Sequence, residues 1–105
     1  MTQLQLDNQH NAIIIIPSEM PNDDDFELWA QLFLHGPEIV IGEFAAGADR
    51  HQCRFTYAQQ SFNLNFEHYS NSIWINGEGI EAEHLLAALA HYFLTLLQQW
   101  GRLIH

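Results

Sequence analysis

The alternation of hydrophobic and polar positions predicts where the chain forms helices and where it forms strands. Between Ile80 and Trp100 the apolar residues recur three and four positions apart, which is the spacing of one face of an α-helix. This face comprises Ala82, Leu85, Leu86, Leu89, Phe93, Leu96, Leu97 and Trp100. The pattern predicts one long C-terminal helix on which the rest of the chain packs.

A second, shorter helix is expected after Pro21. Asn22 and the acidic residues that follow it can cap free backbone N–H groups, and carboxylates favour the positive end of a helix. Its inward face would carry Phe26, Trp29, Ala30 and Phe33, and the sequence Gly36-Pro37 ends it.

The other segments have the pattern of strands. Leu4 and Leu6 alternate with polar residues, which predicts a strand at 2–7. Four consecutive isoleucines ending at Pro17 predict a strand at 12–16 that is covered on much of both faces. Four more strands are expected at 38–46, 52–58, 61–69 and 73–75, with turns at 47–50, 59–60 and 70–72. Such short connections favour an antiparallel meander.

These elements predict a single α+β domain over residues 1–105, in the order β-β-α-β-β-β-β-α. The economical architecture has two layers, a mainly antiparallel sheet of five to six strands with two helices packed on one face. The first helix could also form a crossover that places strands 12–16 and 38–46 parallel, so the strand order stays open.

Composition excludes several functions. The chain has thirteen Asp and Glu against three Arg and no Lys, with a net charge of −10. Such a charge repels nucleic acids and anionic lipid surfaces, so we expect no binding to nucleic acid or membranes. Cys53 is the single cysteine, and the N-terminus has no basic or long apolar segment. Both features favour a cytoplasmic protein.

No group of residues identifies a catalytic, metal or cofactor site. Glu81 and His84 form only a fragment of a di-iron ligand set. His51 and Cys53 share one strand face, but Cys53 falls in an apolar series that is typical of a core residue. We therefore expect no cofactor, no metal and no catalytic residue, and the chain is more probable as a binding protein than as an enzyme.

Two kinds of binding site remain as hypotheses. A run of carboxylates without a neighbouring basic residue could dock on a basic protein; it comprises Glu19, Asp23, Asp24, Asp25 and Glu27. The alternative for this run is a solvated helix start. A cleft between helices and sheet could instead hold a small ligand or substrate, with Tyr57, His68 and Trp74 as candidate residues. His68 has its own alternative as a hydrogen-bonded structural residue.

The function that we favour is therefore a small acidic protein-binding or regulatory module. Its strongest form is an inhibitor or immunity-type protein that neutralises a basic enzyme. A structural homo-oligomer, such as a homodimer, is a third possibility, because Ala87, Ala90 and Leu94 widen the apolar stripe of the C-terminal helix.

The segment from Phe62 to Gly77, Phe-Asn-Leu-Asn-Phe-Glu-His-Tyr-Ser-Asn-Ser-Ile-Trp-Ile-Asn-Gly, resembles the central region of a small proteobacterial family of unknown function. The resemblance covers the second half of the chain. It implies no activity, cofactor or catalytic residue.

Overall fold

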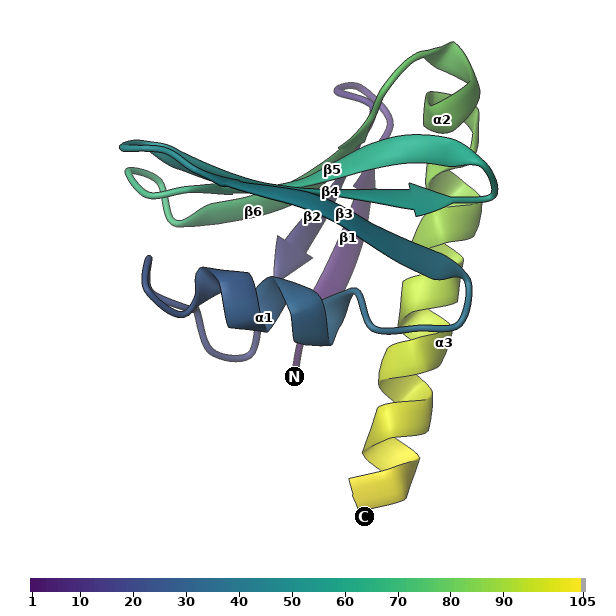
Figure 1. The fold of residues 1–105 in the computed structure, drawn as a ribbon. Helices are drawn as coiled ribbons and strands as arrows, with labels where there is room; N and C mark the ends of the chain where they lie inside the picture. Colours follow the sequence, from purple (N-terminus) through teal and green to yellow (C-terminus); the bar gives the residue numbers. More distant parts are fainter. Residues whose placement is uncertain (105) are drawn as a thin grey trace.

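A computed structural model describes the backbone of residues 1–104 and the side chains of residues 1–99. The strands are β1 (Gln3–Asp7), β2 (Ala12–Ile16), β3 (Ile39–Ala46), β4 (Arg50–Tyr57), β5 (Gln60–Glu67) and β6 (Ser72–Gly77). The helices are α1 (Phe26–Phe33), α2 (Ile80–His84) and α3 (Leu86–Ile104). The predicted α+β class is confirmed, with the sheet as the dominant part (Figure 1).

All six strands form one antiparallel sheet in the order β1-β2-β6-β5-β4-β3. The meander from β3 to β6 is confirmed, because each strand pairs with the next along the chain. β2 and β3 run in the same direction but do not pair, since β6, β5 and β4 lie between them. The segment through α1 therefore crosses from one side of the sheet to its far edge.

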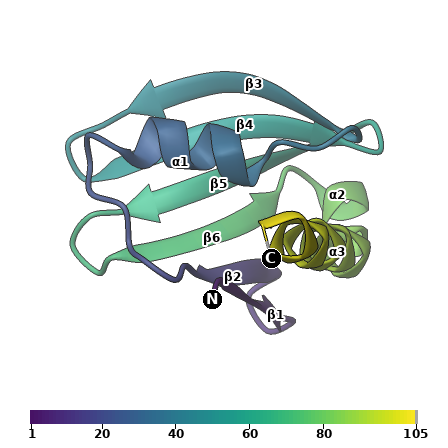
Figure 2. The same ribbon diagram turned by 90° about the horizontal axis from the view of Figure 1, so that it is seen from below.

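The core lies between one face of the sheet and the helices. Phe55, Phe62, Leu64, Phe66 and Ile75 alternate along the central strands and are fully buried on this face. Figure 2 shows α1 lying across β4, while α3 is seen end-on beside β6 and β2. α3 packs against β1 and β2. The two helices meet where the rings of Phe33 and Phe93 contact each other, with their centres 4.8 Å apart and their planes tilted by 37°.

Three local predictions are wrong. The C-terminal helix is not continuous, because Leu85 ends α2 and α3 begins at Leu86. The turn between β4 and β5 lies at Ala58 and Gln59, which both have positive φ, as a two-residue hairpin turn requires. The isoleucine strand is not covered on both faces, since Ile16 is 48% exposed.

The break at Leu85 changes the direction of the chain without exposing the apolar face. Ala82 in α2 is buried, and so are Leu86, Leu89 and Phe93 in α3. Gly77 explains why the chain can approach so closely here, because a Cβ on it would lie 2.8 Å from the Cβ of Ala82. The predicted inward position of Trp100 lies outside the described side chains.

Candidate functional site

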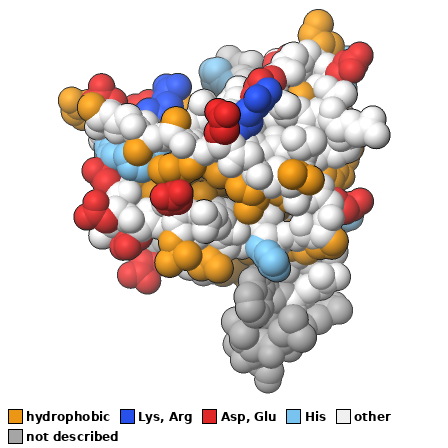
Figure 3. All heavy atoms as spheres, viewed as in Figure 1, with side chains coloured by type: hydrophobic (Ala, Val, Ile, Leu, Met, Phe, Trp, Pro, Cys, Tyr) orange, Lys and Arg blue, Asp and Glu red, His pale blue; other side chains and the backbone are white. Residues whose placement is uncertain are grey.

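The five carboxylates of the acidic run surround the start of α1. All five are exposed, and Figure 3 shows acidic side chains gathered at the left of the molecule, below the sheet. None of them caps the helix: the side chain of Asp25 makes no capping hydrogen bond, and Asn22 Oδ1 accepts the Asp25 N–H instead. The start of α1 is fixed by the buried ring of Phe26, which contacts Phe44 and Phe66. Capping therefore does not account for the carboxylates.

Asp23 is the member of this group with a close partner. Its Oδ1 lies 2.6 Å from Nδ1 of His68, and Nε2 of His68 lies 3.1 Å from Nδ1 of His51. The carboxylate accepts the Nδ1–H of His68, and the second ring nitrogen of His68 shares a hydrogen bond with His51 whose direction depends on the protonation of the two rings. The chain Asp23–His68–His51 ties the segment before α1 to the ends of β4 and β5.

The hydrogen-bonded role expected for His68 is confirmed, but its pairing with His51 was not predicted. His51 is 9% exposed and lies among the rings of Phe26, Phe44 and Phe66. His51 pairs with Phe66 in the hairpin register, which makes His68 its diagonal neighbour on the same face. The register of this hairpin could have predicted the contact between His51 and His68 from the sequence, but only with the turn placed correctly at Ala58 and Gln59.

Cys53 is a buried core residue, as its apolar series predicts. Burial raises the pKa of its thiol, and the nearby carboxylate of Glu27 raises this pKa further. A thiol with a raised pKa forms little thiolate, which is the reactive form. The position of Cys53 therefore suits packing better than nucleophilic chemistry.

The three candidate ligand-binding residues lie in three different places. Trp74 alternates with the buried Ile73 and Ile75 and faces the open side of the sheet, where the guanidinium of Arg50 lies 5.1 Å from its ring centre. Tyr57 lies at one end of β4, beside Tyr92, about 20 Å along the strand from His51 and its neighbour His68. Burial raises the pKa of Tyr57, and the charge of Glu38 adds to this. These three residues therefore do not converge on one place among the described side chains.

An apolar groove does lie between the helices, but it involves other residues. Its volume is about 250 Å³, and it is lined by Thr2, Trp29, Leu32, Phe33, His35, Phe93, Leu96 and Leu97. Pockets for drug-sized ligands usually start at about 300 Å³ and contain several placed polar groups. In the part of the chain with described side chains, no group of three or more His, Cys, Asp or Glu residues could hold a metal ion.

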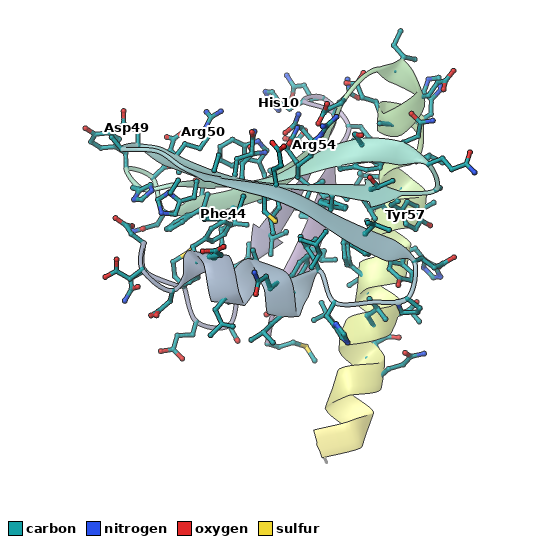
Figure 4. All side chains as sticks on the ribbon, viewed as in Figure 1. His10, Phe44, Asp49, Arg50, Arg54 and Tyr57 are labelled. Carbon is teal, nitrogen blue, oxygen red and sulfur yellow. The ribbon has the colours of Figure 1, made fainter. Side chains whose placement is uncertain are left out.

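The open face of the sheet carries a polar network that the sequence did not reveal. Asn65 is 1% exposed, and its amide contacts Gln52, Asn76 and two backbone carbonyls. Arg54 binds both carboxylate oxygens of Glu78, at 2.8 and 3.0 Å. Figure 4 shows Arg50 and Arg54 above the sheet and Phe44 below it. The two arginines of this face are thus engaged by neighbours within the chain.

Comparison with known families identifies the chain. A model of a family described as a protein of unknown function, DUF3630, matches residues 1–91. The chain belongs to the DUF3630 family. This confirms the resemblance at the level of a family without known function. Searches of curated proteins and of solved structures gave no match.

The DUF3630 match covers the whole sheet, α1 and α2 and reaches into α3. No helix among the described residues is both long and apolar enough to cross a membrane.

Proposed function

We propose that this DUF3630 protein is a non-enzymatic binding module that docks on a basic partner protein through the carboxylates around the start of α1. The observation that carries the proposal is that the carboxylates of Glu19, Asp24, Asp25 and Glu27 are exposed and enter no ion pair or hydrogen bond among the described side chains. Exposed like charges that do not stabilise the fold internally are suited to attract an opposite charge and to raise the association rate.

The hydrogen bonds of Asp23 support a recognition role for this surface. They fix the segment before α1 on the sheet, so the neighbouring carboxylates are held on a rigid support rather than on a mobile loop. Pre-organised charges lose less entropy when a partner binds. The strongest form of the proposal is an inhibitor or immunity-type protein that covers a basic enzyme in the cytoplasm.

The experiment compares two variants with the same loss of charge. Asp24→Asn with Asp25→Asn removes two charges from the proposed surface, and Glu81→Gln with Glu83→Gln removes two from α2. Each variant and the unchanged protein are used for affinity capture from lysate at low salt and at about 1 M salt. At the higher concentration, attraction between charges more than about 3 Å apart is largely screened.

The proposal expects basic proteins to be retained at low salt by the unchanged protein and by the α2 variant, and to be lost by the Asp24/Asp25 variant. All should be released at high salt. Equal capture by both variants, or no basic protein captured at either salt concentration, would count against it.

A further inference from the structure

One edge of the sheet is open along its whole length. β3 is the last strand in the sheet order and has eight residues. Among the described residues, those from Val40 to Ala46 make no hydrogen bond except to β4. Val40 is 67% exposed and Ile41 is 38% exposed. Unpaired backbone groups on a long apolar edge are the usual template for addition of another strand.

The register shows which backbone groups face outward. Tyr57 and Gln60 flank a two-residue turn, so they exchange hydrogen bonds with each other. Bonding alternates along β4, which means that Phe55 and Cys53 bond to β5 and not to β3. Their partners in β3 are Ile41 and Phe44. These two residues therefore direct their N–H and C=O groups away from the sheet.

The charges around this edge that enter no ion pair among the described side chains are all acidic. Glu38 precedes β3, Glu43 lies at its irregularity between Ile41 and Phe44, and Asp49 lies in the following hairpin. None of the three enters an ion pair among the described side chains, whereas Arg50 and Arg54 nearby are paired with Glu67 and Glu78. Figure 3 looks onto this edge and shows hydrophobic patches across the middle of the molecule with acidic side chains beside them.

The edge is continuous with the acidic surface around α1. The ring of Phe26, the first residue of α1, lies 6.3 Å from that of Phe44 in β3. A single partner could therefore contact both the carboxylates before α1 and the second half of β3.

From these observations we propose that β3 accepts an extended basic segment of a partner protein as a seventh strand of the sheet. The inference rests on the proposed function, since it assumes the same basic partner, and it adds how that partner binds. Backbone hydrogen bonds to Ile41 and Phe44 supply the affinity. Lysine or arginine side chains on one face of the added strand would lie near Glu38 and Glu43, and apolar side chains on its other face would lie near the exposed Ile41.

A second copy of the chain fits this edge poorly. Each copy carries a net charge of −10, and antiparallel pairing of two β3 strands would bring two Glu43 side chains to the same edge. A charge and a bulge on an edge strand are recognised devices against self-pairing. The charge repels an identical strand and attracts a basic one, whereas the irregularity between Ile41 and Phe44 limits how far any added strand can pair.

The test uses the full chain and a synthetic seven-residue peptide, Lys-Val-Lys-Val-Lys-Val-Lys. One control peptide has proline in place of valine, which keeps the charge but prevents strand pairing. A second has glutamate in place of lysine. Amide hydrogen exchange by NMR locates the contact, and titration measures the dissociation constant.

The proposal expects protection of the Ile41 and Phe44 amides by the Lys-Val peptide and no such protection by either control. Glu43→Lys should weaken binding by about tenfold through lost attraction, while Glu83→Lys in α2 leaves it unchanged. Ile41→Pro removes one outward N–H and should abolish the protection of the Phe44 amide. Because Glu43→Lys leaves the core intact, the test does not depend on the folding of the proline variant.

The outcomes separate this inference from the proposed function. If both basic peptides bind equally and the β3 amides stay unprotected, strand addition is wrong while docking by charge survives. If neither basic peptide binds, both are overturned. If the β3 amides are protected without peptide in a concentration-dependent way, a second copy occupies the edge and the inference fails.

Discussion

The two edge strands of the sheet differ in length, polarity and cover. β1 has five residues, and the exposed glutamines Gln3 and Gln5 alternate with leucines that face the core side. α3 packs against it. β3 has eight residues, includes the exposed Val40 and Ile41, and has no element of the described chain packed along its outer side (Figure 2). The difference teaches that β1 limits strand addition by its short length and exposed glutamines, while the longer and more apolar β3 is kept from self-pairing by charge.

The largest expected effect on stability comes from proline at Val40. Comparing it with proline at Ile41 distinguishes the backbone groups of β3 that bond to β4 from those that point outward. By the alternation of hydrogen bonds, the Val40 N–H points toward Thr56 in β4. Val40→Pro removes this bond and leaves a carbonyl of β4 without its donor, at a cost of about 2–3 kcal/mol in the free energy of unfolding. Ile41→Pro loses no bond of the sheet and should cost about 1 kcal/mol, mainly from packing. Urea unfolding measures both, and equal losses would show that the assignment of the outward groups is incorrect.

The next prediction removes the charge that protects β3. Glu43→Val should promote self-association through this edge, with at least a tenfold lower dissociation constant for the dimer, or about 1.4 kcal/mol. Gln5→Val makes a similar change on β1, where the short strand limits pairing, and should have little effect. Sedimentation over a range of concentrations compares the two variants. Dimerisation of the β1 variant alone would reverse the comparison between the edges.

A smaller effect is expected at alkaline pH, beneath the β3 edge. Cys53 and Tyr57 are both in β4, and burial raises the pKa of each above its ordinary value, 9.0 for the thiol and 10.0 for the phenol. The folded state keeps these protons longer than the unfolded state, so stability is full below pH 9 and falls as the pH rises toward the folded values. The slope is at most about 1.4 kcal/mol per pH unit for each group.

Urea unfolding at several pH values from 8 upward measures this fall, and the variant Cys53→Ala supplies the control. Its stability should stay constant through the region where the thiol ionises and decline only when Tyr57 begins to ionise. If the variant and the unchanged protein decline together from the start, the thiol does not contribute.

The two edge strands also show how much of the fold could be predicted from the sequence. The period of two in β5, with Phe62, Leu64 and Phe66 inward, fixes which face is buried, so the fold class and the meander followed from local pattern. The position of β3 at the far edge did not follow, because strand order depends on how α1 crosses the sheet and not on any local period. The break at Leu85 was hidden, since the apolar residues continue through it at helical spacing.

Predicting the candidate sites required knowledge of the tertiary structure even more than predicting the fold did. The acidic run was visible in sequence, but the contact between Asp23 and His68 joins residues 45 positions apart and needs the hairpin register. The edge of β3 was hidden for a different reason: its sequence is that of an ordinary buried strand, and exposure comes from the absence of a neighbour in the described sheet. Charge could be counted from the sequence, but which charges remain exposed beside an open edge could not.

The smallest effect on stability is expected at acidic pH, at the end of the edge strand β1. Asp7 ends β1, and a hydrogen bond from the His10 ring, at 2.8 Å, lowers the pKa of its carboxyl below the ordinary 3.8. Its Oδ1 also accepts the N–H groups of Gln9 and His10.

A lowered pKa gives stability that is present above pH 3.8 and lost as the pH falls through the folded value. Since Asp7 is at the surface, we expect loosening of the turn between β1 and β2 rather than unfolding. NMR titration should shift the Gln9 and His10 amides with a midpoint below pH 3.8, and Asp7→Asn should abolish the shift. If the β3 amides moved together with them, the two edges would not respond independently, and the contrast between a locally stabilised edge and an open one would have to be abandoned.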